Sequence, residues 1–150
     1  MELVAFQQAV AAAESSFRAT TPTSPEELFG WEASVGFPLP ASARWLLANY
    51  GCSANCGLDS LSESAQATLR CRQTIGLPPE IVILNDWGDA GVVYLDFRSS
   101  AASAEPPVVW AGTHNLYRLA AGEAQDSDLE VFTGFAEWTL SQAEERANEL

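Results

Sequence analysis

The sequence predicts an α+β domain with N-terminal helices, a central antiparallel β-sheet of about five to six strands, and a C-terminal helix. Capped or amphipathic helical segments fill the chain up to Gly76. After that point, short runs rich in Val, Ile, Tyr and Trp are broken by Gly, Asp, Asn and Pro, which is typical of strands joined by turns. Segregation of helices and strands favours an antiparallel sheet over an alternating α/β fold. We therefore expect one domain over residues 1–150, long enough to bury a sizeable core.

Four helices are expected before the sheet. Apolar residues recur at steps of three and four in the first segment, which gives it the stripe of an amphipathic helix packed on the domain. Ser24 is placed to cap the second helix, Pro25 takes its first position and Gly36 ends it. The four expected helices cover residues 2–18, 25–35, about 40–51 and about 60–73.

The second half of the chain is expected to form strands near residues 80–85, 91–97, 107–111, 115–120 and 129–132, followed by a helix over 134–148. Side chains alternate across the strand at 91–97, with Val93, Leu95 and Phe97 on one face and Val92, Tyr94 and Asp96 on the other. We expect the first face to pack on the core and the second to be more open. The alternative is that a helix covers both Tyr94 and Trp87.

The excess of acidic residues limits the classes of ligand that the protein can be expected to bind. The chain has 20 acidic residues against 7 arginines and no lysine, a net charge of -13. Such a charge repels phosphate, so we expect neither nucleic acid nor an anionic membrane as a partner. Of the acidic residues, 13 lie after residue 75. This asymmetry is typical either of a solubility surface or of a field that attracts a cationic partner.

The three cysteines, Cys52, Cys56 and Cys71, are an odd number in a chain whose first residues lack the basic start of a signal peptide. No apolar run approaches the ~20 residues of a membrane span. We expect a cytoplasmic protein with all three cysteines reduced. A zinc site that includes His114 is the alternative, but no second Cys-x-x-Cys supports it, and we expect no metal and no cofactor.

Residues 82–97 read VILNDWGDAGVVYLDF and place Trp87 among carboxylates. A calcium site at Asn85, Asp86 and Asp89 is one interpretation, but the spacing lacks the pattern of an EF-hand loop, and turn chemistry explains these residues without a metal. A second interpretation is a small hydrolase that uses Asp86 and Asp89 as paired carboxylates. The third is a surface that binds a protein, because large aromatic and charged side chains supply the few anchors of an interface.

The third interpretation gives a set of candidate residues and no catalytic residue. Trp31 and Trp138 are expected in the core, since each lies at helical spacing with apolar neighbours. The candidates for partner binding are Asp86, Trp87, Asp89, Tyr94, Asp96, Trp110 and His114.

In the order and spacing of its motifs, the chain resembles the SUKH superfamily of Smi/Knr-like proteins over about residues 24–140. The resemblance lies in the capped helix from Pro25 to Gly36, Leu39-Pro40 before an aromatic-Leu-Leu helix that ends near Tyr50-Gly51, the Gly88-Asp89 turn, the strand Tyr94-Leu95-Asp96, the run Pro107-Val108-Val109-Trp110, and a closing helix with Phe135, Glu137 and Trp138. It departs from the family in the cysteine-bearing loop after Gly51 and in the tail after Trp110. The resemblance implies an α+β fold and, for bacterial members, an immunity protein that binds and neutralises a toxin, often a nuclease.

The resemblance and the charge together predict an immunity protein for a cognate basic toxin, with a nuclease as the leading class. A nuclease must attract phosphate, so an acidic protein is suited to meet its cationic face. A monomer that is not an enzyme is expected. Two alternatives stay open: a regulatory protein-interaction scaffold, as in fungal members of the same superfamily, and the carboxylate-dependent hydrolase.

Overall fold

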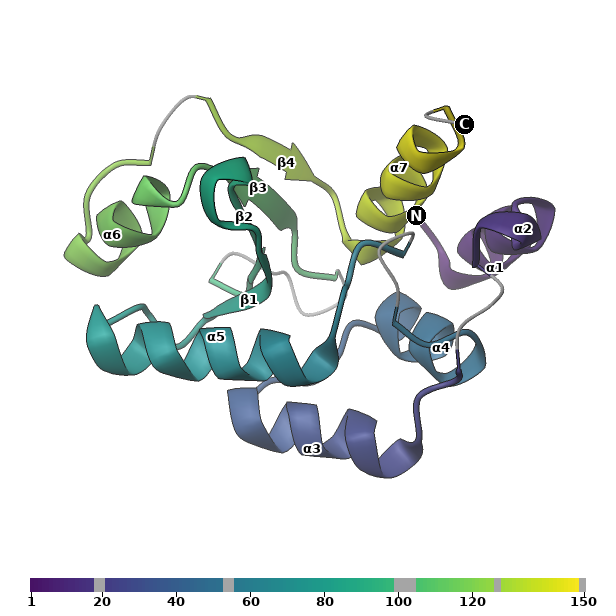
Figure 1. The fold of residues 1–150 in the computed structure, drawn as a ribbon, viewed down its shortest axis with the longest axis horizontal. Coiled ribbons are helices and arrows are strands. Elements are labelled where there is room, and N and C mark those ends of the chain that lie inside the picture. The colour runs from purple at the N-terminus through teal and green to yellow at the C-terminus, as the bar shows by residue number, and fades with distance from the viewer. Residues whose placement is uncertain (18–20, 53–55, 99–104, 126–127, 149–150) are drawn as a thin grey trace.

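The computed structural model describes residues 1–17, 21–52, 56–98, 105–125 and 128–148. In these ranges the chain forms helices and one four-stranded antiparallel sheet with strand order β1-β2-β3-β4 (Figure 1). The elements are α1 (Leu3–Ala12), α2 (Glu14–Phe17), α3 (Pro25–Val35), α4 (Ala41–Asn49), α5 (Leu61–Thr74), β1 (Ile81–Asp86), the short 3₁₀ turn η2 (Gly88–Ala90), β2 (Val92–Asp96), β3 (Val108–Ala111), α6 (His114–Ala121), β4 (Glu130–Phe132) and α7 (Phe135–Asn148). The α+β class is confirmed, and the sheet has fewer strands than expected.

The missing strand is the segment 115–120, which the sequence predicted as a strand and which is the helix α6. The prediction was wrong because Leu116 and Leu119 lie three residues apart and pack together on the sheet, which is the spacing of a helix face. Asn115 is also turned inward and fully buried. Gly122, with φ of 71°, ends the helix in the left-handed conformation that glycine adopts easily.

The helices before the sheet follow their local signals. The hydroxyl of Ser24 accepts a hydrogen bond from the Glu27 amide at 3.2 Å, and α3 ends at Gly36 as expected. The segment 2–18 differs, because it breaks at Ala13 into α1 and the short α2 instead of forming one helix. Phe6 and Phe17 are nevertheless buried in the core. No helix in the described ranges is long and apolar enough to cross a lipid bilayer.

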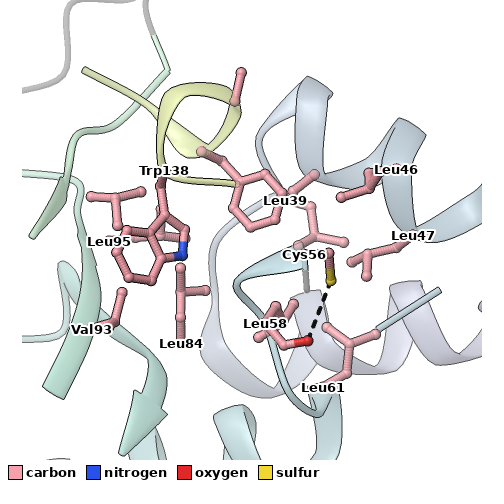
Figure 2. Close-up of a cluster of buried hydrophobic side chains, with 14 of the residues drawn as sticks. Leu39, Leu46, Leu47, Cys56, Leu58, Leu61, Leu84, Val93, Leu95 and Trp138 are labelled. Carbon is pink, nitrogen blue, oxygen red and sulfur yellow. Dashed lines mark hydrogen bonds between the residues drawn. The ribbon is translucent and has the colours of Figure 1, made fainter. Parts of the chain in front are cut away.

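Both faces of the sheet are covered, and this divides the core in two. Val93 and Leu95 of β2 face a first core, which they form together with buried side chains of α1, α3, α4 and α7. Figure 2 shows part of this core, in which Trp138 of α7 lies against the strand side chains. On the other face, Tyr94 packs with Ala67 of α5 and Leu116 of α6 in a second core. The expectation of an open face on β2 is therefore wrong, because α5 and α6 cover it.

Helix α5 also closes one edge of the sheet. The outer strand β1 directs the backbone of Ile83 away from β2, and the amide of Ile83 donates to Thr68 Oγ1 at 2.9 Å. The carbonyl of Ile83 accepts from Ser64 Oγ at 2.6 Å, and Ser64 in turn accepts from the Trp31 indole at 3.0 Å. Helix hydroxyls thus take the place of a neighbouring strand, which is one way that proteins protect a sheet edge.

Candidate functional site

The turn between β1 and β2 is held by a backbone hydrogen bond of its own and by a second one from Thr113. The amide of Trp87 donates to the carbonyl of Gly91 at 2.9 Å, and Thr113 Oγ1 donates to the carbonyl of Gly88 at 2.9 Å. Gly91 has φ of 110°, and a Cβ at this position would lie 2.7 Å from the carbonyl oxygen of Ala111. Only glycine fits a backbone position of this kind, which lets the turn pass close to β3.

A bulge in β1 sets the direction of the strand just before the turn. The register with β2 shifts between Ile83 and Asn85, so that Leu84 is the extra residue and points into the first core. The side chain of Asn85 is then turned toward the loop before α5. Its amide group donates to the carbonyl of Gly57 at 2.7 Å, and its oxygen accepts from the amide of Asp59 at 3.0 Å. Asn85 therefore joins this loop to the turn.

Three indoles meet beneath the turn. The ring of Trp138 is fully buried, and the rings of Trp87 and Trp110 lie 6.1 Å and 5.8 Å from it. Trp87 and Trp110 contact each other edge to face at 5.6 Å and are both partly buried. The indole nitrogen of Trp87 donates to Asp59 Oδ2 at 2.8 Å, and that of Trp110 donates to the carbonyl of Ala90 at 3.1 Å. Trp87 is thus both a packed residue and part of the surface.

Two hollows flank this pair of tryptophans. The first, of about 350 Å³, lies beside α5 and the end of β1, and carboxylates of Asp59, Glu63 and Asp86 line it. The second, of about 200 Å³, lies between the turn and β4. It is lined by carboxylates together with Trp110. We call the whole region the acidic turn surface, defined by the exposed Asp59, Glu63, Asp86, Asp89, Asp128 and Glu130 around Trp87 and Trp110.

The charge of the acidic turn surface is almost uncompensated by cations among the residues that line it. Arg70 is the one arginine in the lining of the two hollows, and it pairs with Asp86 at 3.1 Å. Both partners of this pair are partly exposed, so it contributes at most about 1 kcal/mol to stability. The remaining carboxylates face solvent without an ion pair in the described residues. A cationic partner would gain from contact with them.

Five of the seven residues predicted for partner binding lie on or next to this surface. Asp86, Trp87, Asp89 and Trp110 belong to it. His114 is exposed at the start of α6, and its ring lies against Gly112, which lines the second hollow.

Tyr94 and Asp96 are not part of this surface, which corrects the prediction for both. Tyr94 is fully buried beneath α6, and its hydroxyl accepts from the Asn115 amide group at 3.0 Å. Burial raises the pKa of Tyr94 to about 12. Asp96 lies at the far end of β2 from the turn, is only 8% exposed, and accepts two hydrogen bonds from the Arg98 guanidinium at 3.0 and 2.8 Å. Neither side chain is presented to a partner.

The metal-site alternatives find no geometric support in the described residues. Cys52 and Cys56 lie with the first core, whereas Cys71 lies with the second. Burial raises the pKa of Cys52 to about 12, which keeps it in the thiol form that binds metal poorly. Both polar atoms of Asn85 are already hydrogen-bonded to backbone. No cluster of three or more His, Cys, Asp or Glu side chains is placed to hold a metal ion within the described ranges.

The hydrolase alternative needs two carboxylates that face each other across one cleft. Asp86 and Asp89 do not meet this condition, because Asp86 lines the first hollow and Asp89 the second. Both are exposed, and Asp86 is paired with Arg70. A general acid in such a pair is normally shielded from water. The arrangement is better suited to binding than to acid-base chemistry.

Sequence reasoning missed four of the six carboxylates that define the acidic turn surface. Asp59 and Glu63 lie more than twenty residues before the turn, and Asp128 and Glu130 lie more than thirty residues after it. Glu63 follows Ser60 at the spacing of a capping box, and its amide donates to the Ser60 hydroxyl at 3.2 Å, so the start of α5 explains this residue without a binding role. Comparison of the sequence with protein-family models and with curated proteins finds no match. The resemblance to the SUKH superfamily therefore rests on the residues quoted above.

Proposed function

We propose that this protein is an immunity protein that binds a cognate basic protein toxin, with a nuclease as the leading class, and blocks its cationic face. The observation that carries the proposal is the acidic turn surface, where six exposed carboxylates surround two partly buried indoles. The SUKH resemblance supports the same function. We further propose that the protein acts as a monomer in the cytoplasm, where a delivered nuclease would meet its substrate.

Electrostatics favours a cationic protein as the partner. Carboxylates that face solvent without ion pairs attract a basic surface at long range and accelerate its encounter with the protein. A nuclease carries such a surface because it must hold phosphate. Once the carboxylates contact arginine or lysine side chains, they occupy the groups that would otherwise bind nucleic acid.

The rigidity of the turn favours tight binding. Trp87 is fixed by its hydrogen bond to Asp59 and by its contacts with Trp110 and Trp138. Aromatic side chains that are already ordered lose little conformational entropy on association, and such residues are typical anchors of protein interfaces. The two indoles are therefore the expected centre of the contact, with the carboxylates at its rim.

Co-expression with candidate toxins tests the proposal, and basic proteins encoded next to the gene for this protein are the first to be tried. We expect a stoichiometric complex in size-exclusion chromatography, inhibition of the toxin by the purified protein, and survival of cells that express both proteins. No complex with any of these candidates, or no protection of the cells, would contradict the proposal. A stable complex that leaves the toxin active would favour the regulatory scaffold instead.

A further inference from the structure

The two edges of the sheet differ in how their backbone groups are satisfied. The amide of Asp96 donates to the carbonyl of Pro107 at 3.0 Å, and this fixes the alternation of hydrogen bonds across β2 and β3. Residues 108 and 110 of β3 therefore direct their backbone toward β4, opposite Phe132 and Glu130. It follows that Val131 directs its amide and carbonyl away from the sheet.

The outer edge of β4 is open in the described part of the chain. The strand order places β4 at the end of the sheet, and no described residue bonds to the backbone of Val131 on its outer side (Figure 1). By contrast, α5 satisfies the outward groups of Ile83 on β1. An open edge is a template that another extended segment can join by main-chain hydrogen bonds.

The side chains of β4 indicate which residues a segment that pairs with this edge should carry. Val131 is 59% exposed and lies on the same face as its register partner Val109. Glu130 is exposed on the other face, opposite Trp110, and lines the second hollow with Asp89. The edge thus offers backbone bonds, one apolar contact and a negative flank.

We propose that an extended segment of the basic partner pairs with β4 and becomes a fifth strand of the sheet. An apolar side chain of that segment lies beside Val131, and the next residue, an arginine or lysine, lies beside Glu130 and reaches the second hollow. This inference rests on the proposed function for the identity of the partner. The acidic turn surface and the open edge then form one continuous interface, because Glu130 belongs to both.

A second copy of this chain is a poorer occupant of the same edge. Pairing two β4 strands would bring the second hollow of each copy, with Asp128 and Glu130, toward the other. Each chain also carries a net charge of -13. Repulsion between like charges opposes such a dimer, whereas a basic segment gains from the same charges.

The first experiment uses the full chain and a synthetic peptide of alternating lysine and valine. Titration calorimetry measures binding, and hydrogen exchange by NMR reads the Val131 amide. We expect that amide to exchange freely in the protein alone and to be protected when the peptide is bound, while the amides of Glu130 and Phe132 are protected in both states. A peptide of the same charge with N-methylated backbone on alternate residues is the control, and equal binding of both peptides would overturn the inference.

The second experiment removes the outward amide of Val131. Val131→Pro removes that donor and leaves the bonds from β4 to β3 in place, since proline is tolerated on an outward position of an edge strand. Loss of one interface hydrogen bond together with the steric block should weaken peptide binding by about tenfold or more. Val131→Thr keeps the amide and should stay within about threefold of wild type, because exposed contacts of one methyl group are small. Unchanged binding of Val131→Pro would overturn the inference.

The same variants separate this inference from the proposed function. If the toxin binds Val131→Pro as well as it binds wild type, pairing with β4 is wrong and the immunity function stands. If the peptide pairs with β4 but no toxin complex forms, the edge is confirmed as a docking site and the immunity function is wrong. A dimer of this chain with a protected Val131 amide would show that the occupant is a second copy and would overturn the choice of partner. Should Val131→Pro fail to fold by circular dichroism, the N-methylated peptide with wild type carries the test.

Discussion

Replacing Thr68 with valine tests whether α5 closes the edge of β1. The substitution keeps the shape of the side chain and removes its hydroxyl, which accepts from the Ile83 amide at 2.9 Å. Both residues are fully buried, so water cannot replace the lost acceptor. The carbonyl of Ile83 keeps its bond from Ser64 at 2.6 Å and is less affected.

The expected loss follows from the one amide that is left without a partner. A buried donor without an acceptor costs about 1–3 kcal/mol, and no cavity is added because valine fills the same space. For a chain of this size each kcal/mol lowers the melting temperature by about 2–4 °C. We therefore expect Thr68→Val to lower the melting temperature by roughly 2–12 °C.

Thermal unfolding followed by circular dichroism measures the melting temperature, and urea unfolding measures the free energy of unfolding. Thr74→Val is the matched control. Thr74 is an exposed residue at the end of the same helix, and its hydroxyl donates only to the carbonyl of Arg70 at 2.8 Å. The control should change the free energy of unfolding by no more than about 0.5 kcal/mol. Equal effects of the two substitutions would refute the role of α5 as the cover of the β1 edge.

Three further predictions concern the indole cluster, the response to acid and thiol reactivity. Gly57→Ala should destabilise the protein by at least about 2 kcal/mol more than Gly122→Ala: both glycines have positive φ, but only at Gly57 would a Cβ meet an indole, at 2.4 Å. Comparative urea unfolding checks this. Burial acts to raise the pKa of Asp96, but hydrogen bonds and charge from Arg98 outweigh it and hold the pKa below its usual 3.8. This pair therefore stabilises the fold above that pH and ceases to do so as the pH falls through the folded pKa, so Arg98→Gln should shift acid unfolding to higher pH in a titration by circular dichroism. Because burial raises the pKa of Cys52 to about 12, Ellman's reagent at pH 8 should modify it at least about a hundredfold more slowly in the folded protein than after unfolding.

The sequence predicted best where the signal was local. The cap, the first-turn proline and the final glycine of α3 lie within thirteen residues, and the helix has the expected bounds. In contrast, the segment at 115–120 is short enough that its leucines fit a strand or a helix. Gly122 would have favoured the helix, because glycine commonly follows the last residue of a helix. The burial of Asn115 depends on the packing of α6 and is not visible in the sequence.

The site was only partly predictable because its residues come from separate segments. The turn with Trp87 was visible as a unit, whereas Asp59 and Glu130 join it only through the packing of the loop before α5 and through the pairing of β3 with β4. The misplacement of Tyr94 has a different cause. Its strand, VVYLD, is apolar at four successive positions, which is typical of burial on both faces, and the alternation alone did not reveal the second cover.

The most direct test of toxin binding by the acidic turn surface is to measure the affinity of the toxin for two charge-reversal variants of this protein. Asp89→Lys places a positive charge beside the second hollow. Glu14→Lys makes the same change on α2, at the other end of the molecule from α6 (Figure 1). If the surface binds the toxin, Asp89→Lys weakens the complex by about tenfold or more at low salt, and Glu14→Lys changes it by no more than about twofold. Equal affinities for the two variants would contradict binding at this surface.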